Sequence, residues 1–215
     1  MPLVKKIHVD PSTQVFVWKI TECLEALKTI SLKPESLQRL EKMRSEAHQK
    51  GFVSIRHLMK VAGYSDDDLY YTKDGKPHLK DGKYISITHS YDYSALIVST
   101  HCVGVDIEKN RDTVKRIASK FIDSENTFLK EVNLIEQLTV IWGAKESLYK
   151  IHPDGGLSFK EHMTIDSFDL KDNTTTGWIS RNHLNKCYSI YFHQIEGFSL
   201  VYALPKFDRT KEKNA

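Results

Sequence analysis

Apolar residues recur every three or four positions in two long stretches of the chain, 34–62 and 133–151. This spacing places them along one side of an α-helix, so it predicts helices in both stretches. Proline is favourable in the first turn of a helix and glycine often follows the last, so we expect the first helical region to begin at Pro34 and to end before Gly63. A break at Gly51 would divide this region into two helices.

A shorter helix is predicted to begin at Asp112 or Thr113, both of which are good capping residues, and to reach Phe121. The run His152-Pro153-Asp154-Gly155-Gly156 contains the residue types that stop helices, so we expect it to end the helix over 133–151. Before and after these helices the pattern changes to one that is typical of strands.

Strand patterns occupy two regions, 70–108 and 163–204. Turn signals at Asp74-Gly75 and Asp81-Gly82 divide the first region. Alternating or continuous apolar positions predict strands over 84–88, 95–98, 103–105, 163–168, 175–180, 187–193 and 198–204. The order of strands, helices and strands indicates an α+β fold with antiparallel sheets.

Two parts of the chain share a hairpin pattern. Ile85–His89 followed by Tyr93–Ile97 resembles Ser189–His193 followed by Phe198–Tyr202, so a duplicated chain would have two similar halves that meet near residue 110. The predicted division is into two halves and a charged, flexible tail, at 1–110, 111–205 and 206–215. The alternative is that any two hairpins look alike, and spacing alone does not choose between these explanations.

Charge and composition argue against several classes of protein. The 215 residues include 31 Lys plus Arg and 28 Asp plus Glu, a net charge of +3, so there is no uniform positive field of the kind that binds nucleic acid. Three widely separated cysteines fit neither a disulfide framework nor a zinc site. A secretory signal and an apolar run of about 20 residues are both absent, so we expect a soluble, cytoplasmic protein without membrane contacts.

A pair of carboxylates lies in the motif Gly104-Val105-Asp106-Ile107-Glu108. On a strand, Asp106 and Glu108 project from one face while the apolar residues beside them point into the core. Two converging oxygens suit a hard cation such as Mg²⁺, which takes one or two protein carboxylates and completes its octahedron with water and substrate phosphate. The alternative is an acidic strand end that faces solvent, because Asp-x-Glu is a common pattern.

The long helix carries an unusual polar face. Its members occupy positions i, i+3, i+4, i+7 and i+8 along one stripe: Trp142, Lys145, Glu146, Tyr149 and Lys150. A solvated face with salt bridges would show the same pattern. If Glu146 instead meets the acidic pair, three carboxylates can hold a cation, and the two lysines beside it can bind a pyrophosphate through charge-assisted hydrogen bonds.

Further cationic and polar positions lie upstream. Gly75-Lys76-Pro77 sets a lysine in a rigid turn, and Ile87-Thr88-His89-Ser90 sets hydrogen-bond donors at a strand end. Arg56 lies one helical turn before Lys60. Taken singly, such residues are most often solvated surface positions. Only their combination with the acidic pair and the helix stripe points to a binding site.

The order of these motifs resembles that of the 4'-phosphopantetheinyl transferase superfamily. They follow one another as Gly75-Lys76-Pro77, Ile87-Thr88-His89-Ser90, Gly104-Val105-Asp106-Ile107-Glu108, Trp142-x-x-Lys145-Glu146-x-x-x-Lys150 and Gly156-Leu157-Ser158. The chain length is similar to that of the surfactin-synthetase type, a single chain of two like halves. The resemblance implies a monomer with two α/β halves, antiparallel sheets and packed helices, related by a pseudo-twofold axis. Thr88 stands where the family usually has serine, and it keeps the hydroxyl.

The resemblance also implies roles for individual residues. Asp106, Glu108 and Glu146 would bind Mg²⁺, with Mn²⁺ as an alternative, and Lys150 would hold the pyrophosphate of coenzyme A. His89, Lys76 and Arg56 would contact the 3'-phosphate and the nucleotide end, while Trp142 and Lys145 would shape the site. The full set assigned to coenzyme A is Arg56, Lys76, Pro77, Thr88, His89, Lys145 and Lys150.

The implied reaction is attack by a serine hydroxyl of an apo acyl- or peptidyl-carrier protein on the β-phosphate of coenzyme A, with release of 3',5'-ADP. The catalytic residues would be Asp106, Glu108, Glu146 and Lys150. Glu146 is favoured as the base, with Glu108 and a metal-bound water as alternatives. Two other functions stay open, a non-catalytic module that binds coenzyme A or a carrier protein, and a metal-dependent phosphohydrolase or nuclease. The pathway, whether fatty-acid, polyketide or peptide synthesis, also stays open.

Overall fold

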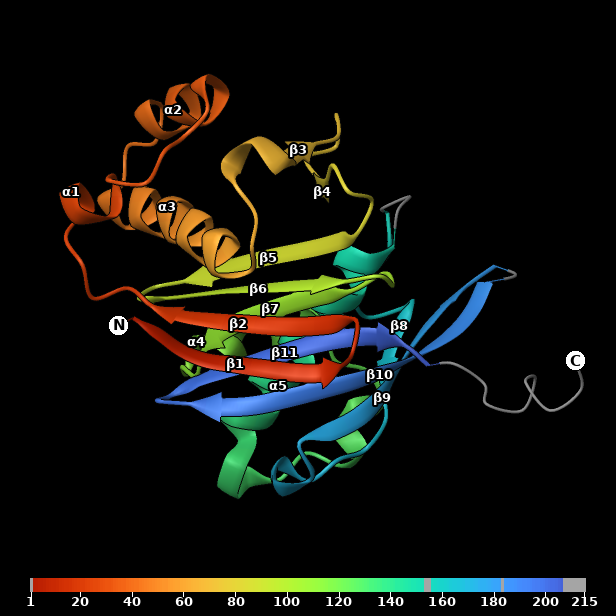
Figure 1. The fold of residues 1–215 in the computed structure, drawn as a ribbon. Coiled ribbons are helices and arrows are strands. Elements are labelled where there is room, and N and C mark those ends of the chain that lie inside the picture. Colours follow the sequence, from red (N-terminus) through yellow and green to blue (C-terminus); the bar gives the residue numbers. More distant parts are fainter. Residues whose placement is uncertain (1, 153–155, 183, 207–215) are drawn as a thin grey trace, which may run out of the picture.

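Two antiparallel sheets lie at the centre of the molecule, with a long helix on the outer side of each (Figure 1). The computed structural model describes residues 2–152, 156–182 and 184–206. The apolar faces of the two sheets meet in a shared core that includes Val17, Ile97, Ile107 and Leu200. The predicted α+β class with antiparallel sheets is therefore confirmed.

The strands form two main sheets and one short hairpin. The first sheet has the order β1 (Leu3–Asp10), β2 (Thr13–Lys19), β6 (Tyr93–Ser99), β5 (Tyr84–Ser90). The second has the order β7 (Gly104–Lys109), β11 (Phe198–Pro205), β10 (Leu184–Ile195), β9 (Thr174–Arg181), β8 (Met163–Ile165). The hairpin pairs β3 (Leu69–Tyr71) with β4 (Pro77–Leu79).

The helices pack on the outer faces of the two main sheets. They are α1 (Leu24–Leu27), α2 (Pro34–Glu41), α3 (Glu46–Val61), α4 (Thr113–Ile117) and α5 (Leu134–Ile151). Ile55, Leu58 and Met59 of α3 share a core with the first sheet, and Ile141 and Leu148 of α5 share one with the second. Short 3₁₀ turns occur at Asp66–Asp68, Ala118–Lys120, Ser124–Thr127, Glu131–Asn133 and Leu170–Asp172.

The central strands read as apolar runs because both of their faces are covered. Every residue of β6 is buried, since α3 lies on one side of this strand and the second sheet on the other. A strand at such a place loses the alternation that marks a half-exposed strand. The run over 95–98 in the sequence has this cause.

The chain path repeats once. In the first sheet β2 is followed by α3 and then by the hairpin β5–β6, whose second strand pairs antiparallel with β2. In the second sheet β7 is followed by α5 and later by the hairpin β10–β11, whose second strand pairs antiparallel with β7. The two hairpins that looked alike in the sequence thus hold equivalent places. The division near residue 110 stays a prediction, and the pairing of β7 with β11 favours a boundary before Gly104.

The predicted ends of the first helical region are confirmed, but its predicted break is wrong. Pro34 opens α2, and Gly63 follows α3 with a φ of +89°, a conformation that glycine adopts without strain. The break lies at residues 42–45. Gly51 is inside α3, because its missing side chain serves a close contact described below and does not interrupt the helix.

Three other predictions need adjustment. The helix expected to reach Phe121 ends at Ile117 and continues as a 3₁₀ turn, and the Asp112 side chain forms no capping hydrogen bond. The strand expected over 163–168 ends at Ile165. The strands β1 and β2 were not predicted. The stop signal at Pro153, Asp154 and Gly155 and the tail at 207–215 lie outside the described residues.

None of the helices within the described ranges is long and apolar enough to cross a membrane.

Candidate active site

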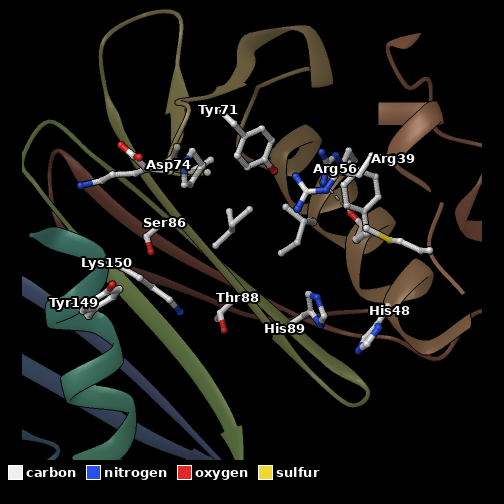
Figure 2. Close-up of a pocket in the computed structure, with 18 of the residues that line it drawn as sticks. Arg39, His48, Arg56, Tyr71, Asp74, Ser86, Thr88, His89, Tyr149 and Lys150 are labelled. Carbon is white, nitrogen blue, oxygen red and sulfur yellow. Dashed lines mark hydrogen bonds between the residues drawn. The ribbon is translucent and has the colours of Figure 1, made fainter. Parts of the chain in front are cut away.

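A pocket of about 1110 Å³ opens where elements from both halves meet (Figure 2). Its walls come from α2 and α3, the β3–β4 loop, β5 and the carboxyl end of α5. The lining residues that carry a charge or an imidazole are Arg39, His48, Arg56, Asp74, Lys76, His89, Lys150 and His152. Apolar and aromatic residues form most of the remaining wall, and three small residues complete it: Met43, Phe52, Ile55, Tyr71, Pro77, Ile85, Ile87 and Tyr149, with Gly75, Ser86 and Thr88. This combination suits a ligand with phosphates at one place and a flat apolar group at another.

Arg56 belongs to the pocket wall, yet its charge is already balanced. The side chain is 2% exposed, and Nε donates to Asp66 Oδ1 at 3.0 Å. Nη1 donates to the Phe52 carbonyl at 3.1 Å, and the guanidinium lies 3.6 Å from the centre of the Phe52 ring. Arg56 therefore supports the wall, and a cation without a carboxylate partner is a better candidate for binding phosphate.

Arg39 is such a cation, and it was missed in the sequence. Its guanidinium lies 5.4 Å from the Phe52 ring and 5.0 Å from the Tyr71 ring. In the part of the chain that the structure describes, no carboxylate pairs with it. Stacking on two rings orients the planar group without using its donors. A lone arginine on a helix surface gives no signal of this role, because the second ring comes from the distant strand β3.

Lys76 links the β3–β4 loop to the end of α5. Gly75, with a φ of +80°, makes the turn that precedes it. Nζ of Lys76 donates to the Ile151 carbonyl at 3.1 Å, and burial lowers the pKa of the amine. Pro77 follows as the first residue of β4 and also lines the pocket. The structure thus places Lys76 and Pro77 in the pocket wall, and their contact with coenzyme A stays a prediction.

Thr88 and His89 lie near the end of β5 and line the pocket (Figure 2). Thr88 Oγ1 donates to Asp106 Oδ1 at 2.9 Å. The His89 ring is open to the pocket but surrounded by protein atoms, and this burial is the main cause of its lowered pKa, followed by the charges of His48 and Lys150. The hydroxyl of Thr88 is therefore used in a hydrogen bond to Asp106, while His89 faces the pocket.

Asp106 and Glu108 occupy alternate positions of β7, as the sequence predicted. Asp106 is 4% exposed, and its Oδ1 accepts hydrogen bonds from Thr88 and from Nζ of Lys150, at 2.9 Å each. Its Oδ2 is buried without a partner. Glu108 accepts a hydrogen bond from Ser90 Oγ at 2.8 Å. Burial is the main cause of a raised pKa of Glu108, and the charge of Asp106 adds to it.

Glu146 lies within electrostatic reach of both carboxylates. Its pKa is raised to about 7, mainly by burial and also by the charges of Asp106 and Glu108, while the charge of Lys150 opposes the shift. The helix glutamate therefore lies close enough to the strand pair for their charges to repel one another, and the sharing of one cation by the three groups stays a prediction.

These residues fit a hard cation, although they do not form a complete metal site. Within the described ranges, no three His, Cys, Asp or Glu side chains are arranged to hold a metal ion. Lys150 forms an ion pair with one oxygen of Asp106. The other oxygen is a buried acceptor without a donor, which costs about 1–3 kcal/mol. A cation at that oxygen would remove this cost and the repulsion from Glu108 and Glu146.

Two glycines let α5 lie directly on the second sheet. A Cβ atom at Gly104 of β7 would be 1.9 Å from the Ser147 carbonyl oxygen. A Cβ atom at Gly143 of α5 would be 2.8 Å from a methyl group of Val201 and 3.6 Å from Asp106 Oδ2. A side chain at either position would force a shift in the packing, and without one the helix lies close enough for Nζ of Lys150 to donate to the carbonyl of Val105 at 2.8 Å.

The assignment of Lys145 to coenzyme A is wrong. Its side chain is fully buried, and Nζ pairs with Glu125 Oε1 at 2.6 Å and donates to the Phe121 carbonyl at 2.5 Å. The predicted stripe is wide enough for its two edges to meet different neighbours. Lys150 at one edge meets Asp106, and Lys145 at the other edge meets the loop before α5.

The aromatic members of the stripe also separate. Trp142 packs against Phe121 and Phe159, at ring distances of 5.1 and 5.4 Å, and it does not line the pocket. Tyr149 lines the pocket, and its ring centre lies 5.7 Å from that of Phe159. Trp142 thus supports α5 from the core, and Tyr149 contributes to the binding surface.

Comparisons with known proteins agree with this site. The family model of the 4'-phosphopantetheinyl transferase superfamily matches residues 102–204. The chain is similar to "Enterobactin synthase component D" of Salmonella typhi, with 27% identity over 140 residues, which cover 63% of this chain and 56% of that protein. It is also similar to "4'-phosphopantetheinyl transferase gsp" of Aneurinibacillus migulanus, with 25% identity over 150 residues, which cover 66% of this chain and 61% of that protein. The chain thus spans less than two thirds of the length of these curated relatives.

Proposed function

We propose that this chain transfers the 4'-phosphopantetheine arm of coenzyme A to a serine of an apo carrier protein, because it belongs to the 4'-phosphopantetheinyl transferase superfamily. One observation carries the proposal. Lys150 lines the basic pocket and also pairs with Asp106, so the pocket and the three carboxylates form one continuous site. A ligand that extends from the pocket to the carboxylates needs a nucleotide end and a polyphosphate, and coenzyme A has both.

The nucleotide end of coenzyme A would lie in the pocket. Arg39, Lys76 and His89 supply donors for its 3'-phosphate, each from a different element. Phe52 and Tyr71 supply flat surfaces near Arg39. Hydrogen bonds between charged groups contribute about 1.5–3 kcal/mol each, so the loss of one cation should weaken binding measurably.

The pyrophosphate would lie beside Lys150, at the junction of the pocket and the carboxylates. Asp106, Glu108 and Glu146 would hold Mg²⁺, or Mn²⁺ in its place. When bound, this ion neutralises charge on the pyrophosphate and so makes the phosphorus easier to attack. Lys150 adds a fixed positive charge where the leaving oxygen gains negative charge.

The acceptor serine would attack the β-phosphorus of coenzyme A. A new bond forms between the serine oxygen and this phosphorus, the bond to the bridging oxygen breaks, and 3',5'-ADP leaves with the electron pair. Glu146 would accept the serine proton. Asp106 and Glu108 accept hydrogen bonds from Thr88 and Ser90, whereas within the described residues no such donor is bonded to Glu146, so one of its oxygens could hold the cation while the other accepts the proton.

The test is intact-protein mass spectrometry of several apo carrier proteins after incubation with this protein, coenzyme A and Mg²⁺. A gain of one phosphopantetheine mass together with 3',5'-ADP supports the proposal, and EDTA should abolish the gain until Mg²⁺ is restored. Release of 3',5'-ADP without a modified protein would indicate a phosphohydrolase. Tight binding of coenzyme A without turnover would indicate a binding module. Including carriers from fatty-acid, polyketide and peptide synthesis also tests the choice of partner.

A further inference from the structure

Gly51 occupies an unfavourable place for a glycine. It lies inside α3, is buried and does not line the pocket. Glycine in a helix interior costs about 1 kcal/mol relative to alanine, because the backbone loses more conformational freedom on folding. Some other interaction must therefore account for a small residue at this position.

The imidazole of His89 fills the space where a side chain of residue 51 would be. A Cβ atom there would lie 2.6 Å from Nδ1, 2.7 Å from Cγ and 3.0 Å from Cε1 of the ring. These distances are shorter than van der Waals contact, so either the ring or the helix would have to move. Because Cγ is the ring atom nearest the backbone of His89, a small rotation of the ring does not relieve the overlap.

The helix is held in place at this turn. Ser54 Oγ donates to the Gly51 carbonyl at 2.8 Å and also contacts Ser94 Oγ of β6 at 2.9 Å. On the next turn Ile55 is buried in the core with the first sheet. A methyl group at residue 51 would therefore displace the His89 ring and leave α3 where it is. His48, whose ring centre lies 6.2 Å from that of His89, limits the directions open to the ring.

We propose that Gly51 is a positioning residue, whose lack of a side chain holds the His89 imidazole against α3 and directs it to the phosphate-bearing end of coenzyme A. This inference rests on the proposed function, because it takes the pocket to be the coenzyme A site. It adds a determinant of affinity that makes no contact with the ligand.

The direct test is Gly51→Ala, measured by calorimetric titration with coenzyme A and by steady-state transfer to a carrier protein. We expect affinity for coenzyme A to fall about tenfold or more, the loss of one charge-assisted hydrogen bond. The turnover number at saturating coenzyme A should stay within about a factor of two, because His89 does not touch the reacting atoms. The melting temperature should stay equal or rise, because alanine favours the helix. A variant whose fold was damaged in general would lose stability and turnover in addition to affinity.

A double-mutant cycle with His89→Ala isolates the mechanism. In the His89→Ala background the ring is gone, so adding Gly51→Ala should cause no further loss of affinity. Val53→Ala is the matched control on the same helix. Val53 is fully buried and does not line the pocket, so this variant should lower the melting temperature and leave affinity for coenzyme A unchanged. If Gly51→Ala alone fails to fold, recovery of the fold in the double variant would still identify the ring as the group displaced.

Binding of 3'-dephospho-coenzyme A, which lacks the 3'-phosphate, tests whether the effect of residue 51 depends on that phosphate. Wild type and Gly51→Ala should bind this ligand with equal affinity. Unchanged affinity of Gly51→Ala for coenzyme A, or an equal loss with and without His89, would overturn the inference. A wild-type protein that neither binds coenzyme A nor modifies a carrier would overturn the proposed function instead.

Discussion

The two oxygens of Asp106 have opposite surroundings. Oδ1 accepts hydrogen bonds from Thr88 and Lys150, whereas Oδ2 is buried without a donor. A carboxylate held in this way keeps its orientation and retains one oxygen for a further ligand. The lysine that holds it also faces the pocket, so at the residue scale Lys150 is the connection between binding and chemistry.

Replacing Lys150 should therefore affect turnover more than binding. We expect Lys150→Ala to reduce the turnover number by about 10²–10³, because a fixed donor at a developing charge contributes on this scale. Lys150→Arg should recover part of the loss, since the positive charge remains. Steady-state kinetics with coenzyme A as the varied substrate checks both variants, and a change confined to KM would contradict the assigned role.

Lys145, one residue before Glu146, should behave differently. Lys145→Met leaves the buried carboxylate of Glu125 without its partner, which should lower the free energy of unfolding by about 3–5 kcal/mol. Adding Glu125→Gln should restore part of this stability. Urea unfolding measures both variants. Because Lys145 does not line the pocket, the folded fraction should bind coenzyme A with unchanged affinity, and a specific loss of affinity would show that Lys145 takes part in binding.

At the scale of elements, the site depends on how closely helices approach strands. Gly104 and Gly143 bring α5 onto the second sheet, and Gly51 lets the end of β5 lie against α3. In each case the small residue comes from one element and the functional side chain from its neighbour. The glycines of such a site are therefore as informative as its charged residues.

Gly104→Ala tests the approach of α5 to β7. The added methyl group would overlap the backbone of Ser147, which cannot rotate away as a side chain can. We expect a loss of about 1–3 kcal/mol in the free energy of unfolding, measured by denaturant titration, together with reduced transfer activity. Gly82→Ala is the matched control, because no atom lies within 4 Å of its added Cβ and only the strain of its positive φ remains. Equal effects of the two variants on activity would argue against close packing as the cause.

At the scale of the whole molecule, the two sheets share one core and the site forms across them. The pocket is lined mainly by the first part of the chain, the carboxylates lie on β7 and α5, and β7 pairs with the last strand. The family match begins at residue 102, just before β7, and ends within β11. We expect the two parts to depend on one another for stability.

A histidine between the sheets should make the stability of the two packed sheets depend on pH. His193 of β10 has a pKa below its usual 6.5, mainly because of burial, with a smaller effect from Lys5 of β1, and its ring contacts Tyr202 of β11. The unfolded chain therefore takes up a proton at a higher pH than the folded protein does. The contribution of His193 to stability should therefore fall as the pH drops below about 6.5, and the fall should end near its folded pKa. Melting temperatures of wild type and His193→Gln between pH 7.5 and 5.5 check this, because the wild type should lose stability relative to the variant as the pH drops.

The sequence by itself determined most of the elements, although not β1, β2 or the true break between α2 and α3, and it determined the identity of the chemical groups. Helical periodicity, turn residues and the spacing of Asp106 and Glu108 act over a few residues, so their signals are complete within short windows. Order along the chain was also sufficient to group the motifs into one family pattern. For these features no knowledge of the distant chain was needed.

Only the tertiary structure decided what each group meets. A helical stripe specifies directions about its own axis, not the neighbours that lie there, so Lys145 and Lys150 read alike in the sequence and have different partners in the fold. Arg39 joins the pocket because Tyr71 packs beside it, and Gly51 is needed because His89 lies against it. Contacts between residues far apart in the chain depend on the packing of whole elements, and a local pattern contains no information about that packing.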